Sequence, residues 1–164
     1  MIVKKIRKFP LRSCTQNLRI ISSIGMRQMK DKIFLDSNII IYAHTDLEPD
    51  KQIIAQKIIS EKTTVLSTQV LQEVANTLTR KFKHSWKDTS RVLDETATNN
   101  ILYTNTIETI MLACSIAEKY SFSFYDSLII AAALDFGCET LYSEDLSDGQ
   151  KIENKLIVVN PFRH

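Results

Sequence analysis

Four acidic side chains lie in or next to apolar segments that a folded chain would bury, and they are the first candidates for chemistry: Asp36, Glu73, Asp126 and Asp145. Carboxylates that are brought together raise one another's pKa unless a cation neutralises them. A cluster of oxygen ligands without His or Cys suits Mg²⁺ or Mn²⁺, whereas zinc sites are built mainly from His and Cys. If these acids meet in the fold, they predict metal-assisted hydrolysis of a phosphodiester.

Each acid also has an explanation that involves no catalysis. Asp126 could cap the apolar helix that follows it, because Asp is a favoured N-cap and is stabilised by the helix dipole. Asp36 could cap the turn after its strand, and Glu73 could be a solvated surface acid. Asp145 could be an ordinary loop residue. The case for a site therefore depends on whether the fold gathers all four.

The elements that would position these acids alternate between strand-like and helix-like patterns. Short apolar runs predict strands at 32–36, 64–67, 101–104, 140–143 and 156–159. Apolar residues at helical spacing predict helices at 50–60, 68–82, 85–99, 106–120 and 125–136, the last ending at a Gly C-cap. Five strands alternating with helices predict an α/β domain with a mainly parallel sheet and right-handed crossovers.

This architecture predicts that the acids lie at one edge of the sheet. Ligands of open parallel sheets bind beyond the carboxyl ends of the strands. Asp36 ends the first strand, the segment 144–148 follows the fourth, and Asp126 begins a helix whose start faces the same edge. Glu73 falls roughly 130° from the centre of the apolar stripe of its helix, so it can face the sheet edge or water.

Composition describes one compact soluble domain without a membrane span. The chain has 164 residues, of which 44% are hydrophobic, and no apolar run approaches the roughly 18 residues that cross a membrane. The three cysteines lack metal-type spacing and indicate the cytoplasm; Cys114 and Cys138 are interpreted as small core residues. In 106–120 one stripe is predicted to be buried: Ile107, Ile110, Met111, Cys114 and Ala117.

Charge divides the chain into two pieces, 1–30 and 31–164. Residues 1–30 hold eight basic side chains and no acidic one, although the whole chain has a net charge of only +2. This basic leader could be an arm that binds nucleic acid, a targeting segment, or an over-extended start that precedes a true start at Met29. We expect the domain itself to occupy 31–164.

Five segments together resemble PIN domains, most closely bacterial ribonuclease toxins of the VapC type. They are "FLDSNIIIYA" (34–43), "QVLQEVANTL" (69–78), "FYDSLIIAAAL" (124–134), "LYSEDL" (141–146) and "VVNPF" (158–162). The resemblance implies a PIN-like α/β/α sandwich, an acidic cluster that binds Mg²⁺ or Mn²⁺, and endonuclease activity on RNA. Similar proteins cleave structured RNA such as tRNA or ribosomal RNA, form homodimers and are neutralised by an antitoxin protein.

The resemblance also assigns roles to individual residues. Asp36 and Asp126 would be direct metal ligands, and Glu73 would be the acid contributed by the helix after the second strand. Asn38 and Ser143 would orient carboxylates or a water through hydrogen bonds.

The fourth acid of the cluster stays open among Glu144, Asp145 and Asp148. Asp145 is preferred for its spacing from the preceding strand, with Asp148 in reserve. The chain shows no clear general-base histidine, because His44 is predicted to be a solvated loop residue.

The segment "RKFKHSWK" (80–87) interleaves aromatic side chains with four cations, which are Arg80, Lys81, Lys83 and Lys87. Cations for phosphates and aromatic faces for bases would suit RNA. Alternatively, the cations complement a helix C-terminus while Phe82 and Trp86 pack at a corner between helices. In similar proteins the adjoining helices also serve dimerisation and antitoxin docking. The sequence leaves these uses open.

Two other classes of function compete with a nuclease. A non-catalytic RNA-binding or protein-interaction domain would keep the PIN-like fold but lose acids. A phosphotransfer enzyme could use Asp36 as its nucleophile at a strand end. A phosphatase resembling haloacid dehalogenases would need a second Asp two residues later, where this chain has Asn38, and a receiver domain would need paired acids at the end of the first strand.

Overall fold

The structure is a computed structural model that describes residues 32–163. The predictions for the basic segment 1–30 and for a start at Met29 concern residues outside this range. None of the helices within 32–163 is both long and apolar enough to cross a membrane.

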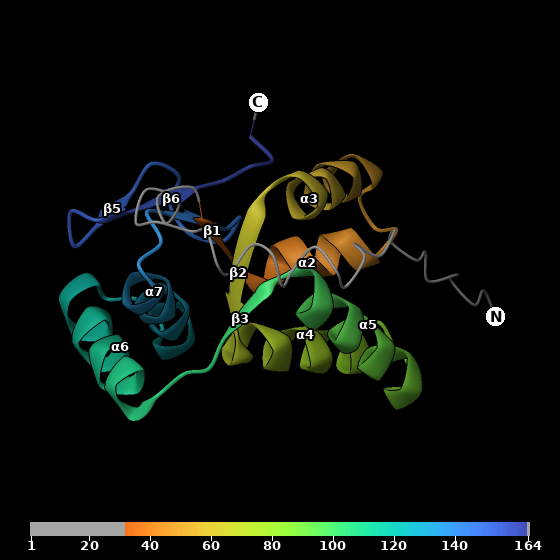
Figure 1. Ribbon diagram of the computed structural model, residues 1–164, viewed down its shortest axis with the longest axis horizontal. Coiled ribbons are helices and arrows are strands. Elements are labelled where there is room, and N and C mark those ends of the chain that lie inside the picture. The colour runs from red at the N-terminus through yellow and green to blue at the C-terminus, as the bar shows by residue number, and fades with distance from the viewer. Residues whose placement is uncertain (1–31, 164) are drawn as a thin grey trace, which may run out of the picture.

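The described chain forms one sheet with helices on both sides (Figure 1). Its strands are β1 (Lys32–Leu35), β2 (Thr63–Ser67), β3 (Ile101–Tyr103), β4 (Thr140–Tyr142), β5 (Lys151–Ile152) and β6 (Leu156–Val159). Its helices are α2 (Ser37–His44), α3 (Pro49–Glu61), α4 (Thr68–Arg80), α5 (Trp86–Asn99), α6 (Ile107–Tyr120) and α7 (Phe124–Phe136). In Figure 1, α6 and α7 lie together on one side, and α2, α3, α4 and α5 lie on the other.

The strand order is β3-β2-β1-β4-β6-β5, and every described pair is parallel except β5 with β6. The predicted α/β class and mainly parallel sheet are confirmed, with six strands where the sequence predicts five. The additional strand, β5, lies between the fourth and fifth predicted strands, at 140–143 and 156–159. It returns to β6 through Glu153 and Asn154, whose φ angles are 51° and 53°. A two-residue strand has too few positions to show a period.

Helix α2 is the described helix that the sequence pattern does not predict. Three consecutive Ile residues, 39–41, favour a strand because branched side chains pack well on a pleated surface. The chain forms a helix here because Asp36 is its N-cap. The Asp36 side chain accepts a hydrogen bond from the Ser37 N–H at 2.6 Å. Ile39 and Ile40 are then buried in the core.

The middle of helix α7 is fully buried, as the apolar run of its sequence predicts. Residues 127–133 are all buried, and the helix ends at Gly137, whose φ of 82° lies in the left-handed region that Gly adopts without strain. It lies between α6 on one side and α4, β2 and β4 on the other. This explains why no polar face is needed in the middle of the helix.

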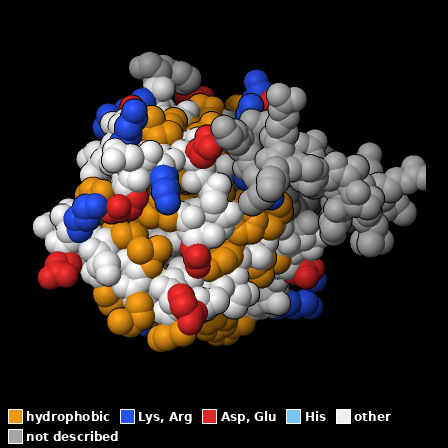
Figure 2. All heavy atoms as spheres, turned by 60° about the vertical axis from the view of Figure 1, so that its left-hand side comes forward, with side chains coloured by type: hydrophobic (Ala, Val, Ile, Leu, Met, Phe, Trp, Pro, Cys, Tyr) orange, Lys and Arg blue, Asp and Glu red, His pale blue; other side chains and the backbone are white. Residues whose placement is uncertain are grey.

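The buried face of α6 differs from the predicted one. Thr109, Ala113 and Ile116 are buried against α7, whereas Ile107 and Met111 are 63% and 61% exposed. Cys114 is exposed as well, so its interpretation as a core residue is wrong, while Cys138 is buried as predicted. Helix α6 packs mainly on α7, and the small residues Thr109 and Ala113 on its contact face allow the two helices to approach closely. Figure 2 shows the side that carries α6, with hydrophobic side chains interspersed with acidic ones.

Candidate active site

Asp36 is the centre of the candidate site because it is both buried and hydrogen-bonded on each carboxylate oxygen. It follows β1, and its backbone N–H donates to Tyr142 O of the neighbouring strand β4 at 3.0 Å. Its side chain is 6% exposed. Oδ1 accepts from the Ser37 N–H at 2.6 Å, and Oδ2 accepts from Ser143 Oγ at 2.6 Å and from Asn38 Nδ2 at 3.0 Å.

Burial raises the pKa of Asp36 to about 6. The hydrogen bonds from Ser143 and Ser37 oppose this shift, while the negative charges of Glu73 and Asp145 add to it. The carboxylate is therefore held in a place that disfavours its charge, with two more acids within electrostatic range. A bound cation would relieve this cost, which makes the position suitable for a metal ligand.

Asp145 joins Asp36 through a shared amide. Asn38 Nδ2 donates to Asp36 Oδ2 and also to Asp145 Oδ2, the latter at 3.2 Å. The Ser143 hydroxyl, which donates to Asp36, accepts from the Asp145 N–H at 3.2 Å. Asn38 and Ser143 thus fix the relative placement of an acid after β1 and an acid after β4.

The other two acids of this loop are bound elsewhere. Glu144 accepts hydrogen bonds at 2.5 Å from both Tyr42 Oη and Lys51 Nζ. Asp148 Oδ1 accepts from the Asn160 N–H at 2.8 Å, which ties the loop to the end of β6. Among the three acids of the loop, Asp145 is the one whose carboxylate is hydrogen-bonded to the group around Asp36.

Glu73 lies in the second turn of α4, a helix that begins where β2 ends. Its carboxylate is half-buried and accepts a hydrogen bond from Gln69 Nε2 at 2.9 Å. It is close enough to Asp36 for its negative charge to raise the pKa of that carboxyl. Glu73 therefore belongs to the same edge of the sheet as Asp36, without a direct hydrogen bond to it.

Asp126 lies in the first turn of α7, but Ser123 is the residue that caps the helix. Ser123 Oγ accepts from the Asp126 N–H at 3.2 Å and donates to Asp126 Oδ2 at 2.7 Å. Within residues 32–163, this carboxylate shares no hydrogen bond with the other three acids. Its place in the fold is given by topology, because α7 leads to the amino end of β4 and so begins toward the carboxyl edge.

The described residues contain no group of three or more His, Cys, Asp or Glu side chains close enough together to hold a metal ion. The donor set at the edge nevertheless fits Mg²⁺ or Mn²⁺ in its chemistry, because it consists of carboxylate, amide and hydroxyl oxygens. One of these, Asn38 Oδ1, is buried and has no hydrogen-bond partner within the described part of the chain. An unpaired buried acceptor on the amide whose Nδ2 bridges two carboxylates is suited to a cation or a water bound to one.

The sequence profile of the PIN domain family matches residues 33–147, which is more than half of the chain. The chain belongs to the PIN domain family. No curated relative matches it in sequence.

Solved structures of other proteins share the fold of this PIN domain. VapC20 of Mycobacterium tuberculosis, a toxin that cleaves the sarcin-ricin loop, is 18% identical with a TM-score of 0.58, covering 68% of this chain and 88% of its own. VapBC2 of Rickettsia felis, bound to a DNA fragment from its promoter, is 18% identical with a TM-score of 0.57, covering 77% and 96%. FitAcB of Neisseria gonorrhoeae is 14% identical with a TM-score of 0.52, covering 80% of this chain and 99% of its own.

A clamp formed by Lys51, Tyr42, Glu144 and Phe162 holds the loop of this PIN domain that carries Asp145, and sequence reasoning missed it. Lys51 Nζ lies 4.6 Å from the centre of the Tyr42 ring and 5.7 Å from that of Phe162. It also pairs with Glu144 at 2.5 Å. Tyr42 and Lys51 lie nine residues apart, but Glu144 and Phe162 are remote from them in sequence, so no local spacing could signal the clamp.

The segment 80–87 of the PIN domain forms the corner between α4 and α5. Its four predicted RNA-binding cations are all exposed: Arg80, Lys81, Lys83 and Lys87. The two aromatic residues behave differently, because Phe82 packs against the core while Trp86 is 74% exposed. The predicted packing of both rings at the corner is therefore wrong for Trp86.

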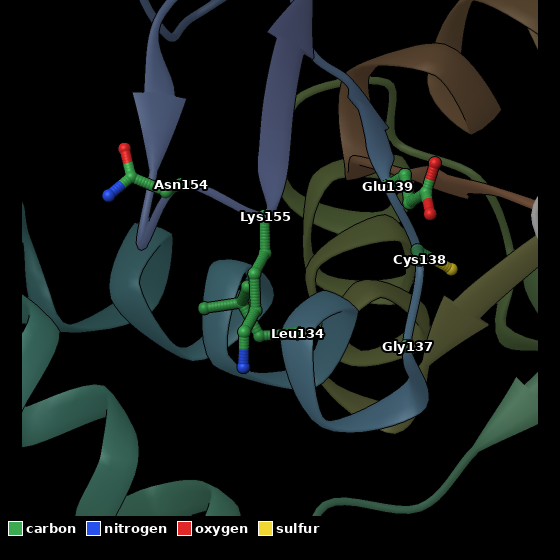
Figure 3. A pocket seen from close by; sticks show the side chains of 6 residues that line it. All are labelled: Leu134, Gly137, Cys138, Glu139, Asn154 and Lys155. Atoms are coloured by element: carbon green, nitrogen blue, oxygen red, sulfur yellow. The ribbon is translucent and has the colours of Figure 1, made fainter.

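A cavity of about 450 Å³ lies at the opposite edge of the sheet in this PIN domain, where α7 ends and β4 begins (Figure 3). It is lined by Leu134, Gly137, Cys138, Glu139, Asn154 and Lys155. Burial raises the pKa of the Cys138 thiol to about 12, so this cysteine is not a nucleophile at neutral pH. The cavity has none of the four site acids in its wall and plays no part in the candidate site.

His44 is the last residue of α2 in this PIN domain, so the prediction that it is a solvated loop residue is wrong. Its Nε2 lies 3.4 Å from Thr96 Oγ1 of α5. Burial, followed by repulsion from His84, lowers the pKa of His44 to about 4. The imidazole is therefore neutral at neutral pH and belongs to the packing of α2 against α5.

Acidification from pH 7 to pH 5 is expected to lower the free energy of unfolding by about 1–2 kcal/mol through His44. The pKa of His44 is about 4 in the folded protein against an ordinary value of 6.5. Between these values the unfolded chain binds more protons, so stability falls as the pH falls. Urea unfolding of wild type and His44→Gln at both pH values measures this, and the variant should lose less stability. Equal losses of stability in wild type and His44→Gln would contradict the lowered pKa of His44 as the cause.

Proposed function

We propose that this PIN domain is a metal-dependent endoribonuclease with its site at the carboxyl edge of the sheet. The catalytic and metal-binding acids are Asp36, Glu73, Asp126 and Asp145. One observation carries the proposal: a buried carboxylate with a raised pKa, Asp36, is hydrogen-bonded through Asn38 and Ser143 to a second acid from the adjacent strand end. Such perturbed acids are typical of functional sites.

The ion is Mg²⁺ or Mn²⁺, which would supply Lewis-acid activation of water and neutralise the charge that builds on the phosphate. The chain's own residues hold and orient the carboxylates. Asn38 Nδ2 donates to both Asp36 and Asp145, and the Ser143 hydroxyl donates to the same oxygen of Asp36. Orientation of this kind typically contributes about 10- to 100-fold to metal affinity or activity.

The proposed substrate is a structured RNA such as tRNA or ribosomal RNA, cleaved in the cytoplasm to a 5′-phosphate and a 3′-hydroxyl. The support is the family and its neighbours, one of which is a toxin that cleaves the sarcin-ricin loop. Single-stranded loops are the usual sequence-specific targets in RNA. The exposed cations of segment 80–87 would contact its phosphates.

The proposed biological role is that of the toxin in a toxin–antitoxin pair, with a cognate antitoxin protein as partner. Two of the similar structures are complexes of this kind, VapBC2 and FitAcB. We infer a homodimer from the exposed apolar face of α6 and the start of α7, where Ile107, Met111 and Tyr125 are each about 60% exposed (Figure 2). Apolar faces of this kind mark interfaces. Light scattering of the full chain would give twice the chain mass if this is right, and the chain mass if it is wrong.

A second candidate is a non-catalytic RNA-binding or protein-interaction domain. One observation favours it, which is that no three ligand-type side chains within 32–163 are gathered closely enough to hold an ion. The acids instead pair with neighbouring polar groups, Glu73 with Gln69 and Asp126 with Ser123. Against it, all four motif acids are present, which a binding domain does not require.

The experiment that separates the two is incubation of the full chain with total RNA in Mg²⁺, in Mn²⁺ or in EDTA. We expect discrete cuts with either metal, products that carry 5′-phosphates, and intact RNA in EDTA. RNA that stays intact under every condition would leave the binding domain as the better account. For the toxin role, expression should arrest growth, and a small gene encoded upstream should relieve the arrest when co-expressed. Unaffected growth would contradict that role.

A further inference from the structure

Trp86 is an exposed aromatic side chain at the corner between α4 and α5. It is 74% exposed at the first position of α5 and is the single tryptophan of the chain. Within 62–100 it is the only large hydrophobic residue that is exposed. Nothing in the packing of the corner requires a tryptophan here, so its flat face is available to a ligand.

The backbone around Trp86 is firmly held, although the ring is not. The Phe82 N–H donates to Thr77 O at 3.3 Å, and the His84 N–H donates to Leu78 O at 3.0 Å, which closes the end of α4. Ser85 caps α5, accepting from the Asp88 N–H at 3.1 Å. A ring on a rigid corner can stack without a large cost of ordering.

The chain around Trp86 is rich in exposed cations. Residues 80–91 contain five basic side chains and one acid, all five basic residues being exposed. The single acid, Asp88, is engaged by Ser85 at 2.7 Å and by Arg91 at 3.5 Å. The surface around the ring is therefore strongly positive, which attracts phosphate groups.

This corner is linked to the candidate site by one side of α4. Glu73 and Arg80 are seven residues apart on that helix. They therefore lie on the same side of the helix and about 10 Å apart along its axis. A single RNA strand bound at the acids could therefore extend along α4 to the cations and Trp86.

We propose that Trp86 is a stacking platform for an unpaired base of single-stranded RNA, with Lys83 and Lys87 contacting the adjacent phosphates. The proposal rests on the proposed function, since it names the form of RNA that reaches the same site. Aromatic faces combined with cations bind single strands without strong sequence preference. Duplex RNA, whose bases are already stacked, would have no base to offer.

RNA fits this surface better than a protein does. The cores of protein interfaces are depleted of Lys and enriched in contiguous apolar residues. Here Trp86 is the only exposed large hydrophobic residue within 62–100, and its neighbours along the chain include Lys, His and Ser. An acidic protein segment is the competing occupant, and the test includes it.

The test uses the single tryptophan as its own probe. The full chain is titrated in EDTA with short oligoadenylate, with an RNA duplex of equal length, and with polyglutamate, while Trp86 fluorescence is recorded. Stacking predicts saturable quenching by oligoadenylate and little by the duplex. Binding of labelled oligoadenylate to Trp86→Ala should be about 5- to 100-fold weaker, and Trp86→Phe should restore most of the affinity.

The two lysines are tested through the salt dependence of binding. In Lys83→Asn with Lys87→Gln, the slope of the logarithm of affinity against the logarithm of salt concentration should become shallower. The expected change is about 0.7 for each phosphate that the variant no longer neutralises. A slope equal to that of wild type would remove Lys83 and Lys87 from the proposed surface.

Wild-type affinity in Trp86→Ala, or equal quenching by duplex and single strand, would overturn the proposal. Stronger quenching by polyglutamate than by RNA would assign the corner to an acidic protein partner instead. Because EDTA excludes metal-dependent cleavage, this result is independent of catalysis. Cleavage without quenching would refute the platform alone, and quenching without cleavage would refute the nuclease alone.

Discussion

Replacing Asp126 with Asn is expected to lower metal-dependent RNA cleavage by about 100- to 10,000-fold. The substitution keeps the size of the side chain and removes the charge that a divalent ion requires. The cap of α7 should survive, because Ser123 Oγ accepts from the backbone N–H of residue 126, which does not change. Initial rates of cleavage of one RNA under saturating Mg²⁺ or Mn²⁺, together with the urea midpoint, measure both effects.

Asp126 is the most informative of the four acids for this purpose because its only described partner is Ser123. If it serves the helix alone, Asp126→Asn will cleave at close to the wild-type rate. Asp94→Asn is the matched control, since Asp94 is an exposed acid on α5. That variant should keep wild-type activity, and a comparable loss in both would refute a site-specific role for Asp126.

Ile130→Ala is expected to lower the free energy of unfolding by about 2–5 kcal/mol. Ile130 is 0% exposed and lies in the middle of the buried run 127–133 of α7. The loss combines the transfer of the removed carbons with a cavity that a helix packed on both sides cannot easily close. Because this helix carries Asp126, the same packing would hold that carboxylate in place for the role proposed for it.

Urea unfolding of Ile130→Ala, Ile130→Val and Ile53→Ala tests this prediction. The Val variant should lose about 0.5–1.5 kcal/mol. Ile53 is 64% exposed on α3, so its Ala variant should stay within about 0.5 kcal/mol of wild type. Equal losses at positions 130 and 53 would show that burial of α7 does not stabilise the domain as described.

The fold class could be predicted from the sequence because short apolar runs indicate strands covered on both faces, and apolar residues at helical spacing indicate the helices between them. The failures came where the local pattern and the tertiary environment disagree. Residues 39–41 resemble a strand, yet the cap at Asp36 starts a helix there. The apolar stripe of α6 resembles a core face, yet α6 packs through Thr109 and Ala113.

The edge of the sheet where the candidate site lies was also predictable, because the strand ends at Asp36 and Ser143 are adjacent in any parallel sheet that pairs β1 with β4. The discrimination among the loop acids was not. It depends on two residues that are remote in sequence: Tyr42 donates a hydrogen bond to Glu144, and the Asn160 N–H donates one to Asp148. The exposure of Trp86 could not be predicted either. Phe82 has a similar sequence context and yet packs against the core, so the local sequence does not distinguish the two rings.

The proposed function requires one metal ion or a pair of ions bound by acids that lie far apart in the chain. The direct measurement is the free energy of unfolding of wild type and Asp36→Asn with and without Mn²⁺, with Asp94→Asn as the control. At a concentration of 100 times its dissociation constant, a ligand of the folded state adds about 2.7 kcal/mol of stability. We predict this gain for wild type and Asp94→Asn and its loss in Asp36→Asn. An equal gain in all three, or none in wild type, would contradict a metal site at Asp36.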